Sequence, residues 1–204
     1  EKNKVNLEFE AAVGGGIPII EPLKQSMAGN TIKKVSGIIN GTTNYILSRM
    51  AKEGADYNEL LIEAQRLGYA ESNPSADVNG LDAADKIAIL SSLAFGGSIK
   101  RECVPTKGIS DLQNRDVEYA KKLGYEVKLL ALSERVSKKI NPKDPLPLIV
   151  RVEPTLIPTA HPLAGVNGVN NAILVEGNPI GQVMFFGPGA GSGPTASALS
   201  LIHI

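Results

Sequence analysis

At Tyr125-Glu126-Val127-Lys128-Leu129-Leu130-Ala131-Leu132, the spacing of apolar residues changes from that of helices to that of strands. Similar strand-like runs follow at residues 146–152, 172–175 and 180–186. Helical patterns dominate the preceding half of the chain. This distribution predicts an α+β fold, a two-layer sandwich in which a mixed or antiparallel sheet carries helices packed on one face.

The first half of the chain carries clear helix signals. Capping residues, helical apolar spacing and terminal glycines mark five segments. We expect these helices over residues 18–28, 44–52, 56–67, 80–95 and 115–123. Two apolar runs, at residues 7–13 and 32–39, are expected to be strands. Residues 69–79 are polar and residues 141–147 are rich in proline, so we expect loops there.

The composition excludes several classes of protein. The 204 residues contain 21 Lys and Arg against 21 Asp and Glu, and a nucleic-acid-binding protein usually has a basic excess instead. No apolar run approaches the roughly 20 residues that span a bilayer, so we expect no membrane partner. The single cysteine, Cys103, excludes an internal disulfide and is expected to be a small buried residue. The expected location is the cytoplasm.

The segment with the most chemistry is residues 68–86, in which acids surround a predicted helix start. Glu71 and Asp77 lie in the loop, where they can point into a cleft. Asp82 and Lys86 are one turn apart on the helix, so the carboxylate can position the ammonium group. A simpler interpretation also fits the spacing: Asp82 complements the helix dipole, its pair with Lys86 is a surface ion pair, and the loop acids are solvated.

A series of sequence blocks, in order, resembles the homoserine dehydrogenases. Besides residues 68–86, these blocks are Glu10–Ile20 (EAAVGGGIPII), Gly37–Leu47 (GIINGTTNYIL), Leu123–Ala131 (LGYEVKLLA), His161–Ala164 (HPLA), Gly187–Gly191 (GPGAG) and Pro194–Ala198 (PTASA). The resemblance implies NAD(P)-dependent reduction of aspartate semialdehyde to homoserine, or the reverse oxidation. It also implies that Lys86 gives a proton to the carbonyl oxygen and that Asp82 orients this lysine or a bound water.

The same resemblance assigns the substrate contacts. Glu71 and Asp77 match the family's substrate carboxylates, and Glu71 suits the substrate's ammonium group. Gly41 and Thr42 match a backbone and hydroxyl contact to the same amino acid. These assignments are chemically consistent, because a zwitterion needs an anionic partner for its ammonium group.

The resemblance further implies a cofactor and an ion. Gly189 and Gly191 match a late glycine turn that contacts NADP or NAD, and the choice between the two stays open. Main-chain carbonyls of Glu10, Val13, Gly15 and Ile17 match a loop that holds sodium or potassium. The alternative for that loop is a plain glycine turn before a helix.

The expected organisation follows from these blocks. Residues 1–186 form a substrate-binding, catalytic and dimerisation domain. Residues 187–204 begin the return to a dinucleotide-binding domain that lies outside this chain, and residues 199–204 do not continue the helix expected there. The family forms homodimers through its sheet. We therefore expect a fragment of an enzyme, inactive alone; the alternatives are a non-catalytic amino-acid-binding dimerisation module, or a related dehydrogenase of amino-acid metabolism.

Overall fold

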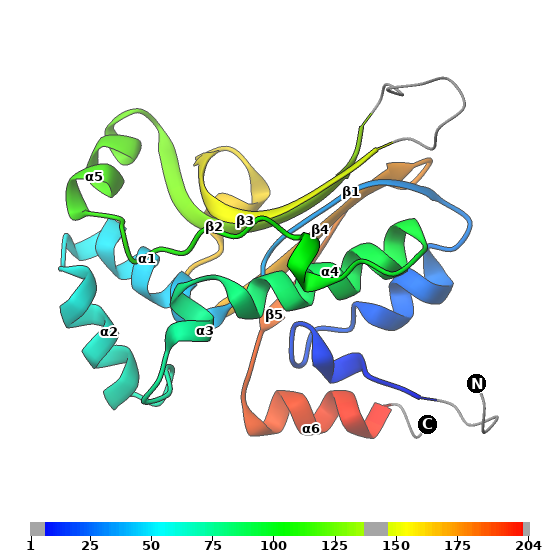
Figure 1. Ribbon diagram of the computed structural model, residues 1–204, viewed down its shortest axis with the longest axis horizontal. Coiled ribbons are helices and arrows are strands. Elements are labelled where there is room, and N and C mark those ends of the chain that lie inside the picture. The colour runs from blue at the N-terminus through cyan, green and yellow to red at the C-terminus, as the bar shows by residue number, and fades with distance from the viewer. Residues whose placement is uncertain (1–6, 137–146, 202–204) are drawn as a thin grey trace.

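The computed structural model describes residues 7–136 and 147–201, which contain a five-stranded antiparallel sheet (Figure 1). The strands are β1 (Thr31–Ile38), β2 (Tyr125–Arg135), β3 (Leu148–Pro158), β4 (Asn170–Asn178) and β5 (Gly181–Pro188). Their order across the sheet is β3-β2-β1-β4-β5, so the first strand in sequence is the central one. The sheet is antiparallel throughout, which decides between the mixed and antiparallel alternatives.

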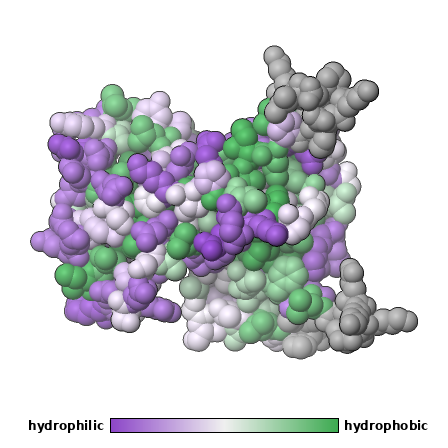
Figure 2. All heavy atoms as spheres, in the orientation of Figure 1, coloured by the Kyte–Doolittle hydropathy of each residue, from purple (hydrophilic) through white to green (hydrophobic). Residues whose placement is uncertain are grey.

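Helices cover one face of this sheet. The helices of the described residues are α1 (Gly41–Glu53), α2 (Tyr57–Arg66), α3 (Ser75–Val78), α4 (Leu81–Phe95), α5 (Asn114–Lys122) and α6 (Ser192–Leu201), with 3₁₀ turns at Glu10–Ala12 and Arg101–Cys103 and a π-helical segment at Pro22–Ser26. A further 3₁₀ turn, Pro162–Gly165, lies on the opposite face. Helices α1, α4 and α5 contact the strands directly. Figure 2 shows mainly hydrophilic residues where α2 and α5 face outward and larger hydrophobic areas toward the right-hand side. The predicted α+β fold is confirmed.

Two hydrophobic clusters lie on opposite faces of the sheet, because neighbouring side chains of a strand point to opposite sides. The larger cluster joins helices to strand residues such as Val35, Ala131 and Ile173. The smaller one packs Leu163 and its neighbours, from the 3₁₀ turn Pro162–Gly165, against Leu174 and other strand residues. Each fully buried Val, Leu or Ile contributes about 1.5–3 kcal/mol. This burial fixes which side of the sheet carries α1 and α4.

The ends of α1 and α4 are set by local sequence. Asn40 caps α1 by accepting a hydrogen bond from the Thr43 amide, and Gly54 ends the helix in the left-handed conformation. Gly80, with φ of 80°, precedes α4. The first turns of both helices therefore begin at defined points, next to the acidic loop between them.

Two predictions for the first thirty residues were wrong in detail. Residues 7–13 form no strand: Glu10–Ala12 is a 3₁₀ turn. Its cause is the Glu10 carboxylate, which turns inward to accept hydrogen bonds from the amides of Ile19, Ile20 and Glu21 at 2.6–2.8 Å. The predicted helix at 18–28 is helical only from Ile20, and Pro22–Ser26 has π-helical geometry.

Other differences are smaller. The loop predicted at 69–79 contains the one-turn helix α3, and residues 199–201 do continue α6, whereas residues 202–204 lie outside the described residues. Residues 141–146 of the loop predicted at 141–147 are outside them too. Cys103 is exposed rather than buried, at the end of a 3₁₀ turn. Across residues 7–136 and 147–201, no helix is long and apolar enough to cross a bilayer.

Candidate active site

A cavity of about 640 Å³ opens between the first turns of α1 and α4, the segment joining α2 to α3, and the turn after β5. We call it the α1–α4 cavity. Its lining includes every predicted catalytic, substrate-binding and cofactor-binding residue: Gly41, Thr42, Glu71, Asp77, Asp82, Lys86, Gly189 and Gly191. Segments far apart in sequence therefore bring these residues to one place.

Lys86 is held in this cavity by two hydrogen bonds. One turn of α4 places Asp82 so that its Oδ2 lies 2.8 Å from Lys86 Nζ. The same ammonium donates to the Ile39 carbonyl at 3.1 Å. An ammonium group has three N–H donors, so one is left for a bound ligand. The Lys86 side chain is 20% exposed, which shields the pair from much of the solvent that weakens surface ion pairs.

Asn40 joins the acids to one another, and sequence analysis missed it. Its Oδ1 caps α1 at the Thr43 amide, while its Nδ2 donates to Asp77 at 2.6 Å and to Asp82 at 2.9 Å. The only sequence signal is its cap position, since an asparagine that caps with its oxygen keeps two amide donors free. One side chain thus fixes two carboxylates beside Lys86.

Asp77 is half-buried and has a perturbed pKa. Burial raises the pKa of Asp77 above its ordinary value, and the charge of Asp82 raises it further. The hydrogen bond from Asn40 and the charge of Lys86 act in the opposite direction. Asp77 is therefore an acid whose charge depends closely on what else occupies the cavity.

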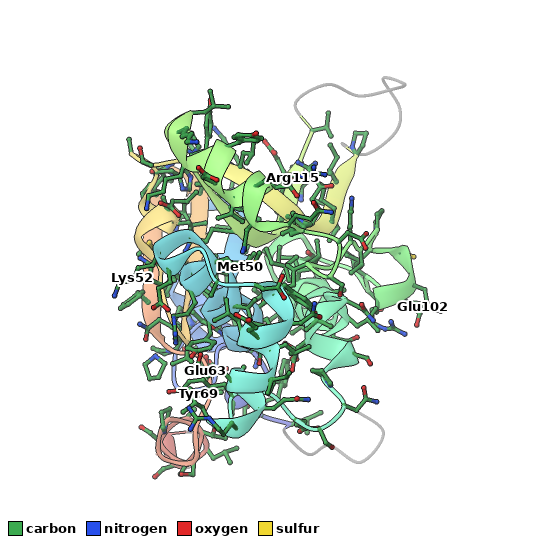
Figure 3. The ribbon with its side chains drawn as sticks, turned by 90° about the vertical axis from the view of Figure 1, so that its left-hand side faces the viewer. Met50, Lys52, Glu63, Tyr69, Glu102 and Arg115 are labelled. Atoms are coloured by element: carbon green, nitrogen blue, oxygen red, sulfur yellow. The ribbon has the colours of Figure 1, made fainter. Side chains whose placement is uncertain are left out.

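One wall of the cavity is built from the loop after α2. Thr42 Oγ1 donates to the Tyr69 carbonyl at 2.6 Å and lies 3.5 Å from Asp77 Oδ2. Glu71 is exposed, and the Gln65 side chain fixes its backbone by donating to its carbonyl at 3.0 Å. Figure 3 labels Tyr69, whose ring lies against that of Tyr45 with the two centroids 5.1 Å apart. The exposed Glu71 carboxylate is free to approach an ammonium group.

The glycine turn after β5 is a product of close packing inside the protein. A Cβ on Gly189 would run into the Asn171 side chain, and a Cβ on Gly15 would lie 2.6 Å from the Gly189 carbonyl oxygen. Asn171 is 1% exposed, and its amide atoms have no hydrogen-bond partner among the described residues. Gly191, with φ of 117°, also requires glycine. The turn presents bare backbone to the cavity, which suits close approach by a ligand.

The loop predicted to hold a monovalent cation packs against this turn. Gly14 and Gly15 both have left-handed φ angles, of 76° and 57°. The Glu10 carboxylate accepts three amide hydrogen bonds at the start of the following helix, so it points away from the loop's main-chain carbonyls. Within the described part of the chain, no group of three or more His, Cys, Asp or Glu side chains could hold a metal.

This fold and this site define a class: an α+β domain with a small polar cavity in which a sheltered lysine meets two carboxylates. The model of the homoserine dehydrogenase family matches residues 18–200. Homoserine dehydrogenase of Synechocystis sp. is 62% identical over 191 residues, covering 94% of this chain and 43% of the relative. That of Bacillus subtilis is 46% identical, covering 98% and 44%. The chain belongs to the homoserine dehydrogenase family.

Solved structures agree. A homoserine dehydrogenase from Thiobacillus denitrificans has a TM-score of 0.89 and 48% identity over 96% of this chain and 43% of its own. A hyperthermophilic archaeal homoserine dehydrogenase in complex with NADPH has a TM-score of 0.76 and 30% identity, over 99% and 56%. This chain thus spans less than half the length of the curated relatives described above.

Proposed function

We propose that this chain is the substrate-binding and catalytic portion of an enzyme that reduces aspartate semialdehyde to homoserine, or runs the reverse, in threonine, methionine and isoleucine biosynthesis. The observation that carries the proposal is the cluster of Lys86, Asp82, Asp77 and Asn40 in one cavity. Membership of the homoserine dehydrogenase family supports the same reaction.

Lys86 acts as the general acid in this proposal. NAD(P)H, when bound, supplies the hydride to the aldehyde carbon. Negative charge then develops on the carbonyl oxygen, and the third N–H of Lys86 donates a proton to it. Asp82 keeps the ammonium group oriented through its 2.8 Å contact. In the oxidation direction Lys86 takes the proton back, so the same pair serves both directions.

Two acids of the cavity hold the substrate's ammonium group in this proposal. Asp77 and Glu71 supply negative charge. The Thr42 hydroxyl already donates its proton to Tyr69, so its oxygen is free to accept a hydrogen bond from that ammonium group. Gly41 begins α1 and contributes backbone next to Thr42. In this proposal the ammonium group of the substrate meets Asp77, Glu71 and Thr42, while its carbonyl group faces Lys86.

The glycine turn and the loop beside it serve the cofactor and an ion. Gly189 and Gly191 contact the dinucleotide, NADP or NAD; one archaeal relative has been solved with NADPH. Carbonyls of Val13, Gly15 and Ile17, with that of Glu10, hold a sodium or potassium ion. We expect residues 187–204 to lead toward the dinucleotide-binding domain, and the enzyme to work in the cytoplasm, where an exposed free thiol such as Cys103 stays reduced.

The proposed assembly is a homodimer formed through the sheet face opposite α1 and α4. Met184 and Phe186 of β5 are 40% and 55% exposed. They pair with Leu174 and Ala172 of β4, which belong to the smaller hydrophobic cluster. Large exposed apolar side chains that continue a buried cluster are typical of a protein interface. A second copy of the chain is the partner we propose.

Replacement of Lys86 by alanine in the full-length enzyme tests the reaction. We expect kcat to fall by about 10²–10⁴, the usual contribution of general acid catalysis, with the thermal midpoint little changed. The matched control is Lys122→Ala, because Lys122 is 63% exposed and outside the cavity lining. Near-normal turnover of Lys86→Ala would refute the assignment. Homoserine binding without any turnover in the wild-type enzyme would favour the non-catalytic module.

A further inference from the structure

Lys128, in the middle of β2, is a buried lysine outside the α1–α4 cavity. It is 1% exposed, and burial lowers its pKa to about 8. No carboxylate lies within ion-pair distance of it among the described residues. Its ammonium group donates instead to the Val166 carbonyl at 2.6 Å and to side-chain oxygens of Asn167 and Asn44 at 2.9 and 3.4 Å. Burying an ammonium group costs folding free energy unless its N–H groups are hydrogen-bonded, and these three contacts offset that cost. What the buried lysine does for the structure follows from the segments that supply the three acceptors.

The three oxygens belong to two segments that meet at Lys128. Val166 and Asn167 precede β4, and Asn44 lies in the first turn of α1. The Asn44 amide group continues the connection by donating to the carbonyls of Gly168 and Asn170 at 2.9 and 3.0 Å. We call residues 166–169, which lead into β4 at Asn170, the pre-β4 loop. Lys128 and Asn44 together bind this loop to the start of α1.

The pre-β4 loop and the first turn of α1 both form walls of the cavity. Val169 and Gly41 line it, and the Val169 carbonyl lies only 3.0 Å from the position that a Cβ on Gly41 would take. The backbones of the two walls are therefore in close contact at this point. The same turn of α1 is capped by Asn40, which holds Asp77 and Asp82.

We propose that Lys128 is a positioning residue for the amino-acid substrate, acting through the pre-β4 loop and the first turn of α1. The inference rests on the proposed function, since it assigns a role in the same site. Lys128 itself does not line the cavity. It sets the distance between Val169 and Gly41–Thr42, and hence the fit of the substrate's amino-acid end.

Lys128→Met in the full-length enzyme tests this role, because methionine is similar in length and suits a buried position without donating hydrogen bonds. We expect the KM for homoserine to rise about tenfold, with kcat within about twofold and the KM for the dinucleotide unchanged, as for a loss of uniform substrate binding. Asn167→Ala removes one acceptor and should raise the KM about threefold. Lys34→Met is the control, since Lys34 of β1 pairs with Glu176 of β4 and lies outside the cavity lining.

Amide hydrogen exchange distinguishes failure of the Lys128 inference from failure of the proposed function. The Gly168 amide donates to Ser48 Oγ at 3.2 Å, and it should exchange several-fold faster in Lys128→Met than in wild type. An unchanged KM together with unchanged Gly168 exchange would overturn the inference. If Lys128→Met does not fold, the same two measurements on Asn167→Ala decide the question. A wild-type enzyme without homoserine turnover would instead overturn the proposed function, while the exchange result would still stand.

Discussion

At the scale of single residues, Asn40 has the largest share in building the site. Its oxygen caps a helix, and its nitrogen holds two carboxylates that are 37 and 42 residues further along the chain. Asp77 and Asp82 would otherwise repel each other. The Asn40 amide reduces that repulsion by donating to both.

Asn40→Asp should separate these two duties. Aspartate is as good a helix cap as asparagine, so α1 should keep its cap. The substitution replaces the amide group that donates to Asp77 and Asp82 with a third carboxylate. We therefore expect kcat/KM of the full-length enzyme to fall by about 10²-fold, which corresponds to the loss of two hydrogen bonds to charged groups. The control is Asp56→Asn at the cap of α2, a comparable exchange outside the cavity lining. Unchanged kcat/KM would contradict the role of Asn40.

The raised pKa of Asp77 predicts a pH dependence. Because burial raises the pKa of this carboxyl, it takes up a proton at a higher pH than an ordinary aspartate. Substrate affinity should therefore fall as the pH is lowered, with a midpoint above the usual value of about 3.9. Homoserine titrations from about pH 7 to pH 4 measure this.

Asp77→Asn provides the comparison, since it should bind homoserine weakly and lose that part of the pH dependence. Persistence of the same midpoint in the variant would show that another group is responsible.

The sequence predicted the contact between Lys86 and Asp82 but not the contacts of Asn40 or Lys128, and the difference has a physical reason. Lys86 and Asp82 are one helical turn apart, so their pairing follows from local geometry. The partnerships of Asn40 and Lys128 depend on how distant segments pack, and neither residue looks unusual in its own surroundings. Cys103 was placed wrongly because one residue does not reveal whether anything covers it.

At the scale of elements, the turn after β5 shows how packing limits sequence. Asn171 fills the space on one side of Gly189, and Gly15 approaches from another. This packing explains why glycine is required at positions 15 and 189, with no need to invoke a ligand. The turn is therefore closely packed against the rest of the protein where it lines the cavity.

Gly189→Ala tests that packing. The added methyl group meets a buried side chain, so we expect a loss of about 1–3 kcal/mol in the free energy of unfolding, measured by denaturant titration. Gly193→Ala is the matched control, because nothing lies within 4 Å of its Cβ position and it sits in α6. Adding Asn171→Ala to Gly189→Ala should restore part of the loss. Equal stability of the two glycine variants would be incompatible with the contact.

Elements with strong local signals were predicted well. The strand expected at 32–39 is β1 at Thr31–Ile38, and the helix expected at 80–95 is α4 at Leu81–Phe95. The prediction of a strand at 7–13 was wrong, because the Glu10 carboxylate caps a helix that begins ten residues later. No local sequence pattern reveals such a contact. Tertiary contacts overrode propensity there.

At the scale of the whole molecule, the sheet face that carries Phe186 is the predicted contact between copies. Phe186→Glu in the full-length enzyme should convert a homodimer to a monomer, because a carboxylate buried at an apolar interface stays unpaired. Sedimentation equilibrium measures the mass directly. Tyr119→Glu, which changes a 60% exposed aromatic residue on α5, should leave the dimer intact. If the wild-type protein sediments as a monomer, the proposed homodimer is wrong.

The strand order β3-β2-β1-β4-β5 has a consequence for synthesis of the chain on the ribosome. Lys34 in the central strand pairs with Glu134 and Glu176, which are translated much later. At about 5–20 residues per second, the nascent β1 waits several seconds for its first neighbour while helices α1 to α5 emerge. Its apolar side chains, Val35 among them, are uncovered by any strand during that interval. Cellular chaperones that shield extended apolar segments should matter more for this polypeptide than for one whose sheet is assembled from consecutive hairpins.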